Sequence, residues 1–163
     1  MMTEMENFIQ IKKSNILKIG IKDENGVDTG EILEFDIESI ELPLKLNQCE
    51  MQHRKNLENL KGQFLVIDKK EDKKGKYILS WKEEEKLKVL QEFYKKEMEC
   101  LDLFLGQGGT KKLLNGRKPY YSMYDDINDM LEPILPKLKL QADDIANKIK
   151  QKYSAKKEIE VLE

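Results

Sequence analysis

The residues best suited to chemistry in this sequence are Cys49, His53 and Cys100, which include both cysteines and the only histidine. Cys49 and His53 are four positions apart, so in a helix they would share one face and could bind one metal ion, with Cys100 as a further ligand. A structural zinc site needs four ligands with paired short spacings, which are absent. Cysteine–histidine catalysis also needs a third group that orients the histidine, and none is identifiable. We therefore expect these side chains to be packed, without metal and without a catalytic role.

Two other segments resemble ligand sites in composition alone. Residues 106–112 are rich in glycine and lysine, but they lack the spacing of a phosphate loop and follow a predicted helix, so a helix stop is the favoured interpretation. An acidic edge could hold a divalent ion, yet its first members lie near a predicted helix start, where negative charge is favourable in itself. We interpret this edge as a solvated face. Its members are Asp125, Asp126, Asp129 and Glu132.

The charge balance argues against nucleic acid and membranes as partners. The chain has 29 Lys and Arg residues against 31 Asp and Glu residues, for a net charge of −2. The lysine-rich stretch 69–76 is interrupted by Glu71 and Asp72 and contains no aromatic residue, so we predict a solvated loop there. No apolar run approaches the roughly 20 residues of a membrane span, and no signal peptide is recognisable. With only two cysteines, we expect a cytoplasmic protein.

The N-terminal part alternates apolar and charged residues with the period of a strand. Alternate apolar residues share one side of each of two segments, with Asn25-Gly26 and Thr29-Gly30 supplying turn residues between them. They are Leu17, Ile19 and Ile21 in segment 16–22 and Leu33, Phe35 and Ile37 in segment 31–37. We predict a β-hairpin over residues 15–38, with lysines facing carboxylates on its wet side. Its apolar face must lie on the chain's own helices or on a partner, because an isolated two-stranded hairpin is marginally stable.

After Pro43 the pattern changes to that of helices. Apolar positions three and four apart predict a first helix over about residues 44–70. Ser80 and Glu83 form a capping box for a second helix that ends at Gly106, and we expect the core to centre near this end. Residues 63–81 have an alternative, because the runs QFLVID and KYILSW could instead form a second hairpin.

The remaining residues predict shorter elements. Thr110 is expected to cap a short turn through Leu114, and Asn115-Gly116 should break the chain before a helix over about 120–132. A last helix follows Pro136, and residues 154–163 are expected to be a frayed, charged tail. The predicted fold is mainly α, with an N-terminal β-hairpin followed by a bundle of four to five helices. It forms one domain over residues 1–163, with the helical region at 44–153.

Two segments and the order of the elements carry a resemblance to a known family. The first segment, FDIESIELPLKLNQC, covers residues 35–49 and contains the end of the predicted hairpin. The second, EMECLDLFLGQGGTKKLLNGRKPYYSMYDDINDML, covers residues 97–131. In it a helix ending in an Asp-x-x-Leu-Gly type sequence runs into a glycine connector, an Asn-Gly step and a helix rich in Tyr and Asp. Over roughly residues 15–140, the chain resembles phage tail assembly chaperones of Gram-positive phages and prophages.

The resemblance implies a mainly helical, non-catalytic protein without a cofactor. Such a chaperone binds the tape measure protein of a phage tail and keeps it soluble until tail tube subunits polymerise around it. The tape measure protein is therefore the expected partner, and the tail tube protein is a second candidate. The chaperone would act in the host cytoplasm and would be absent from the mature virion.

The candidate interaction residues are chosen on physical grounds from the hairpin face and from the region between residues 101 and 131. They are Leu17, Ile19, Ile21, Phe35, Leu101, Phe104, Leu105, Tyr120, Tyr121 and Tyr124. A homo-oligomer is also expected, because amphipathic helices with surplus apolar area readily self-associate. Two rivals stay open, namely another helical protein–protein interaction module of phage or bacterial origin and an enzyme that binds a nucleotide or metal.

Overall fold

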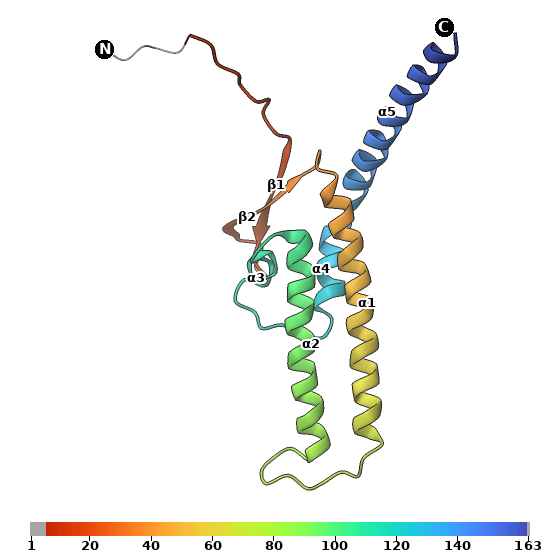
Figure 1. The fold of residues 1–163 in the computed structure, drawn as a ribbon. Coiled ribbons are helices and arrows are strands. Elements are labelled where there is room, and N and C mark those ends of the chain that lie inside the picture. The colour runs from red at the N-terminus through yellow and green to blue at the C-terminus, as the bar shows by residue number, and fades with distance from the viewer. Residues whose placement is uncertain (1–5, 163) are drawn as a thin grey trace.

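The computed structural model describes the backbone of residues 6–162 and the side chains of residues 6–139 and 143–154. The predicted fold class is confirmed, because a two-stranded antiparallel hairpin precedes five helices in this part of the chain (Figure 1). No helix among the described residues is both long and apolar enough to cross a membrane. The elements are β1 (Ile16–Lys22), β2 (Asp28–Asp36), α1 (Glu41–Asp68), α2 (Trp81–Leu105), α3 (Gly109–Leu114), α4 (Met123–Leu131) and α5 (Leu135–Leu162).

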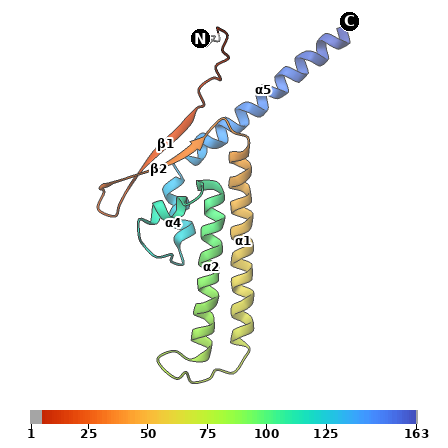
Figure 2. The ribbon, with the colours of Figure 1, turned by 60° about the vertical axis from the view of Figure 1, so that its left-hand side comes forward.

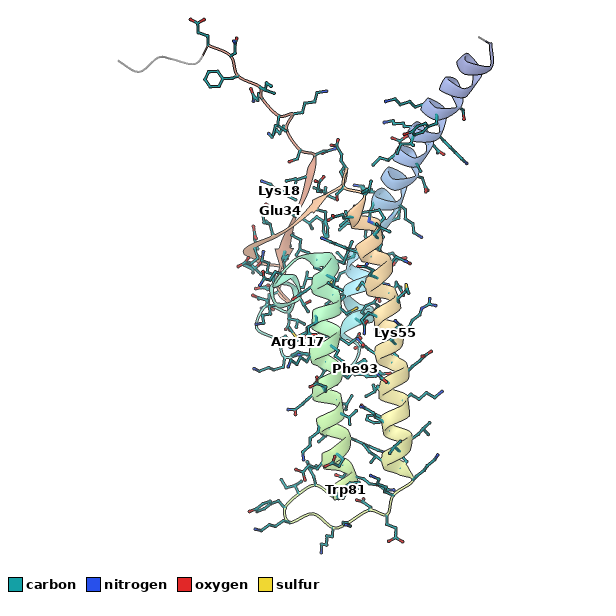
Figure 3. The ribbon with its side chains drawn as sticks, in the orientation of Figure 1. Lys18, Glu34, Lys55, Trp81, Phe93 and Arg117 are labelled. Atoms are coloured by element: carbon teal, nitrogen blue, oxygen red, sulfur yellow. The ribbon has the colours of Figure 1, made fainter. Side chains whose placement is uncertain are left out.

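The hairpin has the predicted two faces. Leu33 and Phe35 of β2 are buried, whereas the residues between and beside them are exposed. On the wet face Lys18 pairs with Glu34 across the strands (Figure 3), and Lys22 pairs with Asp28. Opposite charges at directly facing positions stabilise a hairpin modestly. The alternation in the sequence therefore predicted the strands and their orientation.

The turn between the strands is shorter than predicted. It is closed by Asp23, whose Oδ1 accepts hydrogen bonds from the backbone N–H groups of Asn25 and Val27, both at 2.9 Å. Thr29 and Gly30 already belong to β2, so the prediction that they form part of the turn was wrong. Gly30 has a φ of 78° opposite an irregularity in the β1 register, which explains why a residue with turn propensity sits inside a strand.

The apolar face of the hairpin lies on the chain's own helices. The Phe35 ring packs against Phe104 near the end of α2, with 5.3 Å between the ring centroids. Leu33 lies over Gly109 at the start of α3, where a Cβ would come within 3.6 Å of the leucine. The core therefore centres at the end of α2, as expected. Its buried members are Ile21, Leu33, Phe35, Leu42, Cys49, Cys100, Leu101, Phe104, Leu105, Met123, Tyr124, Ile127, Leu131 and Leu138.

Helices α1 and α2 form a long antiparallel pair (Figures 1 and 2). Helix α1 starts at Glu41, before the expected position, because Pro43 is accommodated in a first turn whose N–H groups need no helical partner. The connection between the helices, residues 69–80, forms no strand. The alternative of a second hairpin over residues 63–81 is therefore wrong, and the helix–loop interpretation is right.

The start of α2 gives a prediction about helix capping. Ser80 Oγ accepts a hydrogen bond from the Glu83 backbone N–H at 3.2 Å, which is half of the predicted capping box. We expect Ser80→Ala to lower the free energy of unfolding by about 1 kcal/mol, because one N–H loses its acceptor. Ser80→Thr should keep most of the stability, since its hydroxyl also caps. Urea unfolding followed by circular dichroism measures both values, and equal losses in the two variants would contradict the cap.

The connector after α2 is held by Asp102. Its Oδ1 accepts hydrogen bonds from the Thr110 backbone N–H at 2.9 Å and from the Thr110 hydroxyl at 2.6 Å. Thr110 therefore lies inside α3, and the prediction that it caps this helix was wrong because Gly108 has that position. Gly106, with a φ of 91°, ends α2 as expected. Asn115 and Gly116 both have positive φ and break the chain as predicted.

The last two helices differ from the prediction at their boundaries. Helix α4 begins at Met123, because Tyr120 and Tyr121 belong to the turn that precedes it, where the Met123 N–H donates to the Tyr120 carbonyl. Helix α5 begins at Leu135 and continues to Leu162, so most of the expected frayed tail over residues 154–163 is helical. No proline or glycine follows Pro136, so nothing in the sequence stops this helix. Glu163 and the side chains of residues 155–162 lie outside the described part.

Helix α5 projects away from the rest of the structure (Figures 1 and 2). Among its described side chains, Leu138 in the first turns is 3% exposed, whereas Ile149 is 50% and Tyr153 is 65% exposed. The apolar stripe of the sequence therefore continues beyond the part of the helix that the core can cover.

Candidate functional site

The structure places most of the predicted interaction residues inside the chain's own core. This is a correction, because an interaction site in the folded chain requires accessible side chains. The buried members are Ile21, Phe35, Leu101, Phe104, Leu105 and Tyr124, and Leu17, Ile19 and Tyr120 are partly buried against them. Tyr121 is the one candidate that is clearly exposed, at 66%. The physical reason is that α2 and α3 supply the cover that the hairpin requires.

An apolar groove lies where the start of α1, the end of α4 and the start of α5 meet. It has a volume of about 780 Å³. We call this space the junction groove. Its apolar lining residues, which we call the walls, are Leu42, Pro43, Leu46, Phe104, Leu135, Pro136 and Leu138. Its polar lining residues, which we call the rim, are Asn47, Glu50, Asn128, Glu132, Lys139 and Asp143. Apolar clefts with a few polar groups at the edge are typical binding sites, and this volume lies in their usual range.

The rim of the junction groove is mainly acidic. It carries the carboxylates of Glu50, Glu132 and Asp143 against the single ammonium group of Lys139. Leu46 and Leu135 on the walls are only partly buried, so apolar surface is accessible in the groove. The arrangement suits a ligand with an apolar stripe and basic flanks.

Further apolar side chains are exposed on segments that extend from the core. In the N-terminal segment, Phe8 is 82%, Ile9 is 99% and Ile11 is 89% exposed. In the loop between α1 and α2, Tyr77 is 86% and Ile78 is 94% exposed. Single exposed apolar residues are common, but a group of them in one segment is a feature of interaction surfaces.

A buried polar network joins the middle of α1 to α2. Glu97 is 2% exposed, and its carboxylate lies 2.6 Å from His53 Nδ1 and accepts a hydrogen bond of 2.9 Å from Asn56 Nδ2. Asn56 in turn accepts a hydrogen bond of 2.9 Å from Gln52. Every polar atom of this network that is buried has a partner. Such a network makes one helix register strongly preferred over others.

Helix α4 covers this network with Tyr124. The Tyr124 and His53 rings are stacked with 3.4 Å between their centroids and an angle of 3° between their planes. Burial raises the pKa of the Tyr124 hydroxyl above its ordinary value, and the nearby Cys49 raises it further. Tyr124 therefore stays neutral over the physiological pH range and acts as a packing and hydrogen-bonding residue.

The two cysteines are in contact between α1 and α2, Cys49 on α1 and Cys100 on α2. Cys100 Sγ lies 2.9 Å from the Cys49 carbonyl oxygen and 3.4 Å from Cys49 Sγ, and both side chains are free thiols. The hydrogen bond from Cys100 lowers the pKa of the Cys49 thiol below its usual value, although burial opposes the shift. The same contact and burial raise the pKa of Cys100. Cys49 is thus the more acidic thiol of the pair.

Two members of the buried network were missed in the sequence, although the sequence contains a signal for each. Glu97 lies four positions from both Phe93 and Leu101, so it belongs to the buried face of α2. Asn56 lies four positions before Leu60 on the buried face of α1. A polar residue at an apolar position of a helix is informative, because burying it requires a partner.

The residues considered for metal binding are arranged for packing. Cys49 and Cys100 are in contact with each other, whereas Nδ1 of His53 is in hydrogen-bonding contact with the Glu97 carboxylate. In the part of the chain that the structure describes, no three His, Cys, Asp or Glu side chains are grouped to hold a metal ion. In the acidic edge, Asp125, Asp129 and Glu132 are exposed and Asp126 is partly buried.

Comparisons with protein-family models, curated proteins and solved structures gave no match.

Proposed function

We propose that this chain is a phage tail assembly chaperone that binds the tape measure protein and keeps it soluble during tail assembly. It acts in the host cytoplasm, has no catalytic role, and leaves before the virion is complete. The order of the hairpin, the long helices, the glycine connector and the Tyr/Asp-rich helix supports this proposal through the family resemblance. The tail tube protein is a second candidate partner.

The junction groove is the structural observation that carries the proposal. An amphipathic helix binds by laying its apolar face in a groove, with anchor residues three and four positions apart. A tape measure protein is expected to form long helices with apolar stripes that need cover before assembly. Leu46 and Leu135 would contact such a stripe, and basic residues beside the stripe would lie near Glu50 and Glu132.

The closed core supports the groove as a binding site. Because the hairpin face is covered by α2 and α3, the chain needs no partner to bury its main apolar cluster. The partly exposed walls of the groove are therefore available in the folded chaperone. Ile149 and Tyr153 on the projecting part of α5 extend the accessible apolar surface away from the same junction.

The proposal is tested by co-expressing the chain with the tape measure protein of the same phage or prophage and measuring how much tape measure protein is soluble and co-purifies. We expect Leu46→Glu to reduce the co-purified amount by on the order of tenfold, because a carboxylate enters an apolar wall with an acidic rim; this corresponds to about 1.4 kcal/mol of binding free energy. Leu87→Glu is the matched control, since Leu87 is 48% exposed on α2 and does not line the groove.

Each outcome separates a different claim. If the wild-type chain neither binds the tape measure protein nor increases its solubility, the chaperone function is wrong, and another helical interaction module becomes the better interpretation. If Leu46→Glu and Leu87→Glu bind equally well, the partner binds outside the junction groove. Circular dichroism of both variants shows whether a loss of binding is instead a loss of folding.

A further inference from the structure

The thiol pair between α1 and α2 has a geometry that goes beyond packing. Cys49 and Cys100 are 51 residues apart in the sequence, yet their sulfur atoms lie 3.4 Å from each other. Both side chains are nearly fully buried, at 2% and 1% exposure. An S–S bond is about 2.05 Å long, so the two atoms need to approach by about 1.4 Å, which rotation of the side chains and a small helix shift can supply.

We propose that Cys49 and Cys100 form a reversible disulfide that cross-links α1 to α2 when the protein meets a peroxide. This bond is independent of the proposed chaperone function, because it depends only on the chain's own two thiols.

The two cysteines have different roles in the oxidation: Cys49 reacts with the peroxide, and Cys100 then closes the disulfide. Cys49 is the more acidic thiol, since it accepts the hydrogen bond from Cys100, so its thiolate attacks one peroxide oxygen. For hydrogen peroxide, the O–O bond breaks, Cys49 becomes a sulfenic acid, and one water molecule leaves. The Cys100 thiol then attacks the Cys49 sulfur, forms the S–S bond and releases a second water molecule. In total two thiols lose two hydrogen atoms, and one peroxide is reduced to two water molecules.

Burial determines how fast this reaction proceeds. The Tyr124 hydroxyl lies 4.0 Å from Cys49 Sγ on the α4 side, so a peroxide reaches the thiols when the packing there opens locally. We expect slower oxidation than for a free cysteine, and faster oxidation in urea below the unfolding transition. Cys100 is already beside Cys49 and competes with further oxidation of the sulfenic acid.

The cross-link would act on the junction groove. Leu46 is one helical turn before Cys49 on α1, Phe104 is one turn after Cys100 on α2, and both side chains line the groove. A bond between the cysteines fixes the spacing of these two walls. The effect on partner binding rests on the proposed function, whereas formation of the bond does not.

The test uses the full-length wild-type chain and hydrogen peroxide as the probe. After oxidation of the folded protein, the sample is denatured, free thiols are alkylated, and the intact mass is measured. We expect a monomer that has lost two hydrogen atoms, takes up no alkyl group, and regains two reactive thiols with dithiothreitol. The melting temperature of the oxidised monomer should rise by about 5–10 °C, because the unfolded chain is constrained by a long closed loop.

A variant separates the two roles. Cys100→Ala should give no intramolecular bond and should accumulate a Cys49 sulfenic acid that dimedone captures. The proposal is overturned if wild-type thiols are both alkylated after peroxide treatment, or if oxygen is added to one cysteine without a cross-link. A disulfide between two chains in place of the bond within one chain also overturns it.

Discussion

Replacing Phe104 by alanine is expected to lower the free energy of unfolding by about 3–5 kcal/mol. Phe104 is 5% exposed, packs against Phe35 at 5.3 Å between ring centroids, and holds the hairpin against the end of α2. Removing its ring takes away buried apolar area and leaves a cavity that the surrounding helices can fill only in part. Urea unfolding of both proteins, with the m-value checked for constancy, measures the difference.

The neighbouring residue supplies a matched control for this prediction. Leu103 is 49% exposed, so Leu103→Ala should cost less than about 1 kcal/mol. Similar losses at the two positions would contradict the orientation of α2 in the structure. An unchanged melting temperature of Phe104→Ala would mean that the ring does not stabilise the core, and lost partner binding in that variant would then reflect only its place in the wall of the junction groove.

Replacing Glu97 by alanine is the second change with a large expected effect, a loss of about 2–6 kcal/mol in the free energy of unfolding, because two polar groups lose a partner at roughly 1–3 kcal/mol each. Glu97 is buried and accepts a hydrogen bond from Asn56 and contacts the ring nitrogen of His53. Without the carboxylate, the buried Asn56 amide and the partly buried His53 ring nitrogen lose their partner, and the desolvation they underwent on folding is no longer compensated.

Two variants show whether the buried network is the cause. Glu97→Gln keeps the shape and an oxygen that can accept from Asn56, so it should lose less than Glu97→Ala. Glu99→Ala, on the exposed side of the same helix, should be within about 0.5 kcal/mol of the wild type. If Glu97→Ala is as stable as Glu99→Ala, the network contributes nothing measurable to folding. Thermal and urea unfolding of the three variants provide the comparison.

Much of the fold follows from local signals in the sequence. The alternation around Ile19 predicted β1, and the alternation around Leu33 and Phe35 predicted β2. Ser80 with Glu83 predicted the start of α2. Gly106 predicted its end. These signals are local because the conformation of each segment depends on its own periodicity, caps and turn residues.

The same signals could not show what covers each apolar face. The pattern of the hairpin predicts that Phe35 is buried, but it is the same whether the cover is α2 or another protein. For this reason Leu101, Phe104 and Leu105 were assigned to an interaction surface and are found in the core. The junction groove was not predictable either, since Leu46 and Leu135 come together through tertiary packing.

The ends of the helices show a further limit of sequence patterns. The charged residues after Tyr153 suggested a frayed tail, yet they are good helix formers and no breaker follows Pro136. The charged composition of this segment indicated a frayed tail, whereas its helix propensity indicated a helix. The structure shows the helix, which continues to Leu162. Composition alone is a weak guide to a helix that extends beyond the core and has few tertiary contacts.

The most direct test of the proposed function is hydrogen exchange of the full-length chain, measured with and without the tape measure protein. We expect slower exchange on binding at residues 42–50 in the first half of α1 and at residues 128–139 across the α4–α5 junction, because these segments form the groove. Exchange in the connection at residues 69–80 should stay the same. Unchanged exchange throughout the chain, or protection confined to residues 69–80, would contradict binding of the tape measure protein in the junction groove.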